Sequence, residues 1–165
     1  MAFKAVSVVS VIASVVEDVR KKFPEVYYSH SRINELGTVV KSMMSVNKKV
    51  FPLIYLVEDI EMSTGSEDST TSVSLTIYFA TTTKLKIRSE ERTKEVIEPI
   101  LVPIYEEFIN ALCRNRSIRN EYKMLWPSHK AVNIPFAEGD ALFIDKSLDA
   151  IKVSDLKLKF INSQC

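Results

Sequence analysis

The sequence contains few of the residues from which common functional motifs are built. Its 165 residues include only three glycines, two cysteines and two histidines. Three scattered glycines exclude a glycine-rich loop that cradles phosphates. The cysteines, Cys113 and Cys165, form neither a CxxC pair nor a framework of four or more, so we expect a reducing compartment.

An excess of charge of either sign is also absent. The chain has 22 Lys+Arg against 21 Asp+Glu, a formal net charge of +1, whereas a general nucleic-acid binder needs a basic excess to displace the counterions of phosphates. Hydrophobic residues make up 46% of the chain and charged residues 26%, which is typical of a globular protein with one core. The length predicts a single domain over residues 1–165.

No hydrophobic run is long enough to span a membrane. The longest, residues 5–16, has about a dozen residues, against the ~20 that a transmembrane helix requires. A secretory signal is the alternative, but Glu17 and Asp18 follow the run without a small-x-small cleavage site. We therefore expect a retained amphipathic helix that ends before Pro24. Its core-facing residues recur every three or four positions and are Val8, Ile12, Val15, Val19 and Phe23.

The next segments predict two strands separated by a loop. Residues 50–57 are almost all apolar, as in a strand covered on both faces, with Pro52 near its start. Residues 73–80 alternate between apolar and polar, which predicts a half-exposed strand antiparallel to the first. The polar segment 58–71 predicts a long exposed hairpin loop, and residues 27–37 predict a connection with a short helix.

The clearest helix extends over about residues 89–116, with Ser89 as a candidate cap. Pro99 and Pro103 fall inside it. Each removes a backbone hydrogen bond, so we expect a kink or a break between residues 95 and 103. Apolar residues recur every four positions on the side that faces the core: Val96, Ile100, Ile104, Phe108 and Leu112.

The final strand, which begins near Ala150, carries apolar residues of two parities. A bulge near Ser154 and Asp155 would return all of them to one face of the sheet. These residues are Ile151, Val153, Leu156, Leu158 and Phe160. Residues 117–148 predict irregular structure with at most one short strand. Together the elements predict an α+β fold, a two-layer sandwich with helices packed on one face of a small, mainly antiparallel sheet.

Side chains that bind metals or act as nucleophiles do not form a recognisable motif. His30, Cys113 and His129 share no metal-ligand spacing, so we expect no metal site and no cofactor. Cys113 and His129 could form a nucleophilic pair, but a buried structural thiol is the commoner outcome for a cysteine within a long helix. Basic residues near the end of this helix are interpreted as complements of the helix dipole: Arg114, Arg116, Arg119 and Lys123.

One enzyme-like pattern combines Asp140 with Asp155 and Lys157. It superficially matches the acid, acid-x-lysine arrangement by which some nucleases hold magnesium beside a strand. With 21 acidic residues in the chain, such a triplet is expected by chance about twice, so the match carries little weight. We expect no catalytic residue and keep a magnesium-dependent nuclease that uses Asp140, Asp155 and Lys157 as the alternative. A small secreted binding domain is a third hypothesis if the N-terminal segment is a signal.

Four segments resemble small virion proteins of the tailed phages and prophages of Bacteroidetes. The match extends over roughly residues 5–162, including Glu91 and Arg92 before the third segment. The segments are Lys49–Leu56 (KVFPLIYL), Ala80–Thr83 (ATTT), Glu98–Phe108 (EPILVPIYEEF) and Leu148–Leu158 (LDAIKVSDLKL). The chain differs in its β-branched N-terminal helix and its polar segment 58–71, so neck and tail end both stay open as the position in the particle.

The resemblance implies a neck or tail-completion protein, similar to the tail-terminator and head-tail joining families. In those families helices pack on a small sheet and the subunits assemble into rings below the portal. The resemblance also implies a protein that is not an enzyme, is made in the bacterial host cytoplasm and becomes part of the virion. The implied partners are other copies of the chain in a six-fold or twelve-fold ring and adjacent portal, neck or tail proteins. No membrane is implied, and at most passing contact with packaged DNA.

Overall fold

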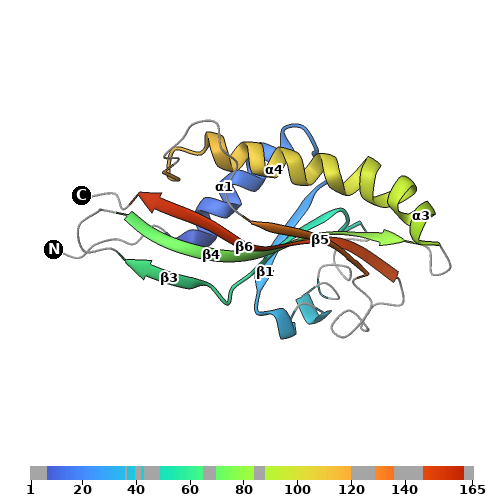
Figure 1. The fold of residues 1–165 in the computed structure, drawn as a ribbon, viewed down its shortest axis with the longest axis horizontal. Coiled ribbons are helices and arrows are strands. Elements are labelled where there is room, and N and C mark those ends of the chain that lie inside the picture. The colour runs from blue at the N-terminus through green and yellow to red at the C-terminus, as the bar shows by residue number, and fades with distance from the viewer. Residues whose placement is uncertain are drawn as a thin grey trace.

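A mixed sheet of six strands with helices packed against it forms the framework of the protein (Figure 1). The computed structural model describes residues 7–35, 37–39, 42, 49–64, 70–83, 88–119, 129–135 and 147–161. The strand order is β1-β2-β4-β6-β5, and β3 also pairs with β4. Of the strand pairs in these residues, only β1 and β2 are parallel. The predicted α+β class is therefore confirmed.

The helices form a layer over one face of the sheet. They are α1 (Val8–Arg20), α3 (Ser89–Arg92), the π-helix η2 (Thr93–Leu101) and α4 (Val102–Arg114). The strands are β1 (Tyr27–Ser31), β2 (Leu53–Val57), β3 (Glu61–Thr64), β4 (Thr70–Thr83), β5 (Lys130–Pro135) and β6 (Ser147–Ile161). The short 3₁₀-helix η1 (Ile33–Glu35) packs through Ile33 against the other face. None of the helices in the described part of the chain has the length and apolar character to cross a membrane.

The apolar N-terminal run forms α1, as its periodicity predicts. Ile12, Val15, Val16 and Val19 have no exposed surface and belong to the main core between the helices and the sheet. The helix ends before Pro24, as expected. Because these valines fill the layer above the sheet, the segment is an integral part of the core.

The long helix changes its hydrogen-bond pattern where its two prolines fall. Pro99 lies inside the π-helix η2, and regular α-helix resumes at Val102. Pro103 is the second residue of α4, directly after the π-helical turns. The chain stays helical from Ser89 to Arg114, so the effect expected between residues 95 and 103 is a change of helix type and not a break. The cap is not Ser89, because the helix begins with that residue. The cap is Arg88, whose N–H donates to Glu91 Oε2 at 3.4 Å.

The central strands confirm part of the burial pattern. All of β2 is buried, as its continuous apolar run predicts. The prediction of a half-exposed strand over residues 73–80 holds for Ser74 and Thr76 but is wrong for Tyr78 and Ala80, which are buried. Tyr78 and Ala80 lie on the sheet face away from the helices, which we call the open face. A second apolar cluster buries them there and includes Val50, Leu53, Tyr55, Tyr78, Ala80, Leu148 and Ala150.

Two polar segments that predicted loops form strands instead. Tyr27–Ser31 is β1 and pairs in parallel with β2. The expected long hairpin loop over 58–71 is also wrong, because Glu61–Thr64 is β3 and β4 already begins at Thr70. Both strands lie at the side of the sheet, where one face or one edge meets solvent and polar residues are tolerated.

The predicted bulge in β6 is present at Ser154 and Asp155. Ile77 pairs with Val153 but Leu75 pairs with Leu156, so β6 has one extra residue at this point. Asp155 adopts a positive φ of 53°, a conformation that Asp tolerates better than most residues. The strand starts at Ser147, slightly before the expected Ala150. As predicted, its apolar residues all face the main core: Ile151, Val153, Leu156, Leu158 and Phe160.

A charged clamp joins the ends of α1 and α4. The Glu107 carboxylate accepts from Arg114 Nη2 at 2.7 Å and from Lys22 Nζ at 3.1 Å, and its side chain is only 13% exposed. These bonds, the one from Arg114 above all, lower the pKa of Glu107. A carboxylate with a lowered pKa in the folded state stabilises the fold above the ordinary glutamate pKa, and this contribution is lost as the pH falls through the lowered value.

We expect Glu107→Gln to lower the free energy of unfolding by about 1 kcal/mol at pH 7, because it removes a clamp between partly exposed ions. The difference from the original protein should shrink as the pH falls below the ordinary glutamate pKa and through the lowered pKa of the folded protein. Urea unfolding at pH 7 and pH 3 measures both values. Glu106→Gln, at an exposed neighbouring position, is the control and should change little. A deficit that is equal at both pH values would contradict the role of the ionised clamp.

Adjacent residues of β6 should respond in opposite ways to an introduced carboxylate. Leu158 is 4% exposed, whereas Lys157 is exposed on the opposite face. Leu158→Asp should cost several kcal/mol and prevent folding, because it buries an unpaired charge. Lys157→Asp should leave the fold intact. Circular dichroism and urea unfolding of the two variants compare them, and equal damage from both would contradict the register of β6.

Candidate functional site

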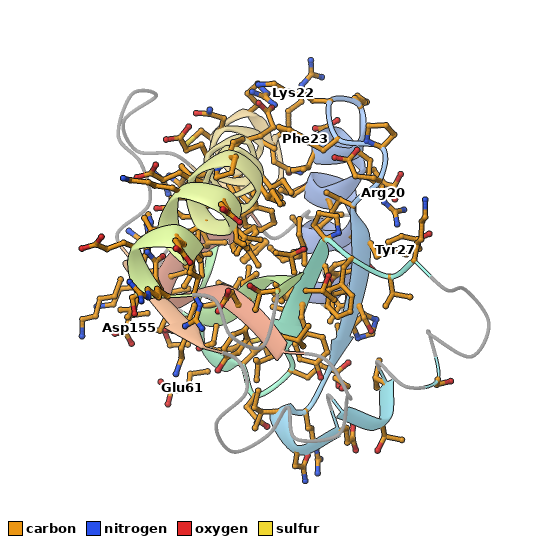
Figure 2. All side chains as sticks on the ribbon, turned by 90° about the vertical axis from the view of Figure 1, so that its right-hand side faces the viewer. Arg20, Lys22, Phe23, Tyr27, Glu61 and Asp155 are labelled. Atoms are coloured by element: carbon orange, nitrogen blue, oxygen red, sulfur yellow. The ribbon has the colours of Figure 1, made fainter. Side chains whose placement is uncertain are left out.

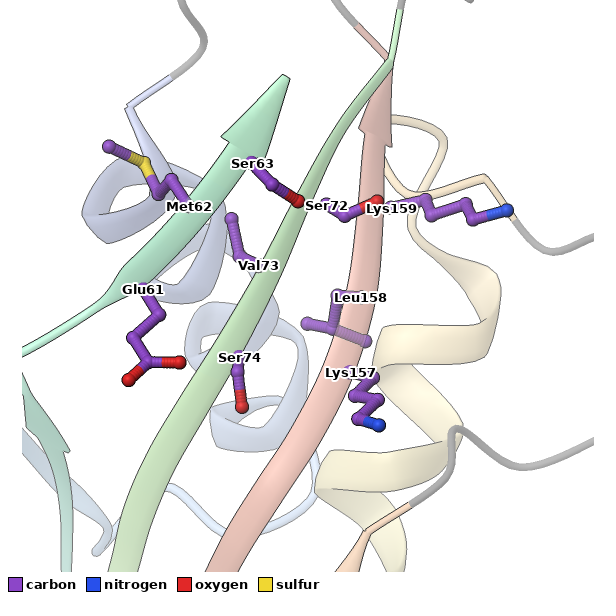
Figure 3. A pocket seen from close by; sticks show the side chains of 9 residues that line it. All are labelled: Glu61, Met62, Ser63, Ser72, Val73, Ser74, Lys157, Leu158 and Lys159. Carbon is purple, nitrogen blue, oxygen red and sulfur yellow. The ribbon is translucent and has the colours of Figure 1, made fainter. Parts of the chain in front are cut away.

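An open groove lies on the sheet face opposite the helices (Figure 3). It lies over β3, β4 and β6 and has a volume of about 450 Å³. In Figure 2 Glu61 lies below the sheet, on the side away from Lys22 and Phe23. The groove is therefore separate from the main core.

The strand register arranges the groove's side chains in two rows. In the first row Glu61 pairs with Ser74, and Ser74 pairs with Lys157. The second row, two residues further along each strand, contains Ser63, Ser72 and Lys159. Facing residues of neighbouring strands lie about 5 Å apart, so each row is a continuous line of polar groups across three strands.

The β6 side of the groove is basic. Lys157 and Lys159 are both exposed, and the backbone N–H of Arg119 donates to the Lys159 carbonyl at 2.7 Å. Because Ile118 pairs with Phe160 and is buried, its neighbour Arg119 falls on the Lys159 side of the sheet. Lysine, arginine and serine side chains together can hold carboxylates or phosphates through charge-assisted hydrogen bonds.

The residues that line the groove include serines, lysines and a single carboxylate, Glu61. They include no histidine and no cysteine. In the described ranges, no three His, Cys, Asp or Glu side chains gather closely enough to hold a metal ion. The arrangement can bind a polar or charged surface through charge-assisted hydrogen bonds.

The fold explains the positions of two residues of the nuclease alternative, Asp155 and Lys157. Asp155 lies in the bulge of β6, and its carboxylate contacts Lys130 Nζ at 3.0 Å. Lys157 is exposed on the open face, two residues further along the strand. These placements agree with the interpretation of Asp155 as part of the bulge and of Lys157 as part of the solvent-facing side of the strand. Asp140 lies outside the described residues.

The other candidate residues are also placed separately. His129 Nε2 lies 2.5 Å from Tyr105 Oη, and their rings meet edge to face. Cys113 is eight residues further along α4, about 12 Å from Tyr105 along the helix axis, so the thiol and the imidazole are at different levels of the helix. His30 Nδ1 contacts Glu58 Oε1 and joins the ends of β1 and β2. Arg114 serves the clamp on Glu107, and Lys123 lies outside the described residues.

A buried ion pair that was not expected from the sequence connects α3 to the sheet. Asp149 of β6 is 1% exposed, and its Oδ1 lies 3.2 Å from Arg92 Nε. Burial raises the pKa of the Asp149 carboxyl, and the Arg92 charge opposes the rise. The pair lies beneath the helix layer, so it fixes the start of the long helix and is not an accessible site.

Comparison with known proteins finds no match to any family model and no similar curated protein. The candidate site therefore depends on geometry alone. Sequence reasoning singled out Lys157 and Asp155 but missed Ser63, Ser72, Ser74 and Lys159 as a group. These residues have in common only their positions on paired strands, which can be recognised once β3 is known to pair with β4.

The conformation of Asp155 can be tested separately from its ion pair. Asp155→Gly should retain the stability of the protein, because glycine adopts a positive φ without strain and an exposed ion pair contributes little. Asp155→Val should lower the free energy of unfolding by roughly 1–2 kcal/mol, because a β-branched residue is strained there. Urea unfolding measures both variants. Equal losses in the two would mean that the contact with Lys130, and not the backbone, is what matters.

Proposed function

We propose that the protein is a non-catalytic structural subunit that forms a ring at the neck or tail end of a phage particle. The observation that carries this proposal is the open sheet face, which presents two ordered rows of glutamate, serine and lysine side chains. A surface of this kind is suited to contact with another protein. The resemblance of four segments to small virion proteins indicates which assembly this would be, namely a ring in a phage particle.

Exposed apolar side chains at the sides of the sheet support a role in assembly. Met62 of β3 is 64% exposed and Val132 of β5 is 54% exposed. In the described part of the chain, no further strand pairs with the outer edge of either strand. Unpaired edges with apolar side chains are sites where another chain adds. A subunit with different surfaces on its two sides makes head-to-tail contacts, which close into a ring when the rotation between neighbours allows it.

The alternative of a magnesium-dependent nuclease has less support. It requires the Asp155 carboxylate for the metal, but this carboxylate contacts Lys130. Its other acid, Asp140, lies outside the described residues.

We expect the purified protein to form a closed oligomer of six or twelve subunits. Sedimentation velocity over a hundredfold range of concentration, combined with light scattering, measures the mass, and negative-stain images show whether the particle is a ring. A protein that stays monomeric over the whole range would contradict the proposal. Cleavage of DNA that needs magnesium and disappears in Asp155→Ala, with the fold intact, would support the nuclease instead.

A further inference from the structure

The outer side of the long helix is acidic. Residues 88–106 expose five carboxylates and only two cations, Arg88 and Lys94. The carboxylates lie on the side away from the buried Val96, Ile97, Leu101 and Ile104, so they face solvent together. We call them the acidic helix face: Glu90, Glu91, Glu95, Glu98 and Glu106.

The open face of the sheet has the opposite charge. Five cations lie on this face of β5, β6 and the adjoining residue 119, against the two carboxylates Glu61 and Asp155. Lys152 marks one end, where its Nζ lies 5.8 Å from the centre of the Tyr78 ring. We call the cations the basic sheet face: Arg119, Lys130, Lys152, Lys157 and Lys159.

These two faces lie on opposite sides of the molecule. Figure 1 shows α3 and α4 above the sheet, and Figure 2 shows Glu61 of the open face below it. The charges are therefore separated across the thickness of the domain. A chain with a net charge of only +1 thus has one acidic and one basic side.

The two faces also match in size and shape. Glu90 to Glu106 spans about 20 to 24 Å along a helix, and Lys152 to Lys159 spans about 23 Å along a strand. A helix with its side chains is about 10 to 12 Å wide. The three strands beneath the groove place their outer axes about 10 Å apart, which is close to the width of one helix. The groove itself covers Lys157–Lys159 of β6, so it would contact only part of the helix.

We propose that the acidic helix face of one copy of this chain docks on the basic sheet face of the next copy. This inference rests on the proposed function, because it names the contact by which the ring would form. A second copy is the occupant that the charges favour, since the same chain carries both the cationic surface and an acidic surface of matching length. The contact joins two different surfaces, so it is head-to-tail and produces a ring or, without closure, a filament.

Charge reversal tests the contact with two variants that complement each other. Lys157→Glu with Lys159→Glu makes both faces acidic, and Glu95→Lys with Glu98→Lys makes both faces basic. Each variant alone should need at least about tenfold more protein for half-maximal assembly, because like charges then meet across the contact. Mixed in equal amounts, the two should assemble again, since each acidic face then meets a basic face. Sedimentation velocity measures all of these samples.

Control variants separate this contact from general effects of charge. Lys21→Glu with Arg116→Glu, and Glu25→Lys alone, change exposed charges outside both faces and should assemble as the original protein does. Circular dichroism and thermal unfolding check that each variant is folded. Assembly of the original protein should also weaken as salt rises, because screening shortens the range of these charges.

The possible results distinguish this inference from the proposed function. A closed ring that persists unchanged in both reversal variants would overturn the docking contact and leave the ring intact. A filament that both variants abolish and their mixture restores would support the contact and overturn the ring. An original protein that is always monomeric would overturn both. Binding of labelled duplex DNA that is lost only in the Lys157→Glu, Lys159→Glu variant, with assembly unchanged, would assign the basic sheet face to nucleic acid.

Discussion

The antiparallel pairing of β4 with β6 is the constraint on which the rest of the structure depends. The pairing runs from Thr70 opposite Ile161 to Thr83 opposite Ser147, and it is interrupted only at the bulge. On one side it presents Leu75, Ile77, Val153 and Leu156 to the helices. Without the extra residue at the bulge, a strict alternation would turn half of β6 to the wrong face. The bulge therefore gives a single core to a strand whose apolar residues have two parities.

The same pairing creates the open face. Side chains alternate between the two faces of a strand, so each residue that points toward the helices has neighbours on the open face. Ser72, Ser74, Lys157 and Lys159 therefore come together as a consequence of how the core is filled. At the other end of this face Tyr55, Tyr78 and Leu148 form a second apolar cluster. The open face is thus divided into a covered apolar end and a polar, basic end, and only the latter is left for a partner.

The charged groups divide into those that stabilise the subunit and those that remain on its surface. Glu107 joins two helices through Arg114 and Lys22, and Asp149 fixes the start of the long helix through Arg92. The acidic helix face and the basic sheet face lie on the surface, where Lys130 contacts Asp155 and Lys152 lies over the Tyr78 ring. A nearly neutral chain with one acidic and one basic side is suited to repeated contacts between identical subunits, because the acidic side of one subunit attracts the basic side of the next.

The sequence by itself determined the elements whose periodicity reflects burial. The spacing of valines predicted α1, the continuous apolar run predicted β2, and the change of parity predicted the bulge at Asp155. The prolines predicted an irregularity in the long helix, which is the π-helix η2. Only the tertiary structure decided the positions of β1 and β3, because Tyr27–Ser31 and Glu61–Thr64 carry no apolar pattern of their own and become strands by pairing with β2 and β4. The candidate site is of the same kind. Its serines and lysines come from three strands, of which β3 and β4 are consecutive and β6 is distant from both in the sequence. Local sequence patterns report burial along one element, whereas a row across strands exists only once the register between the strands is set.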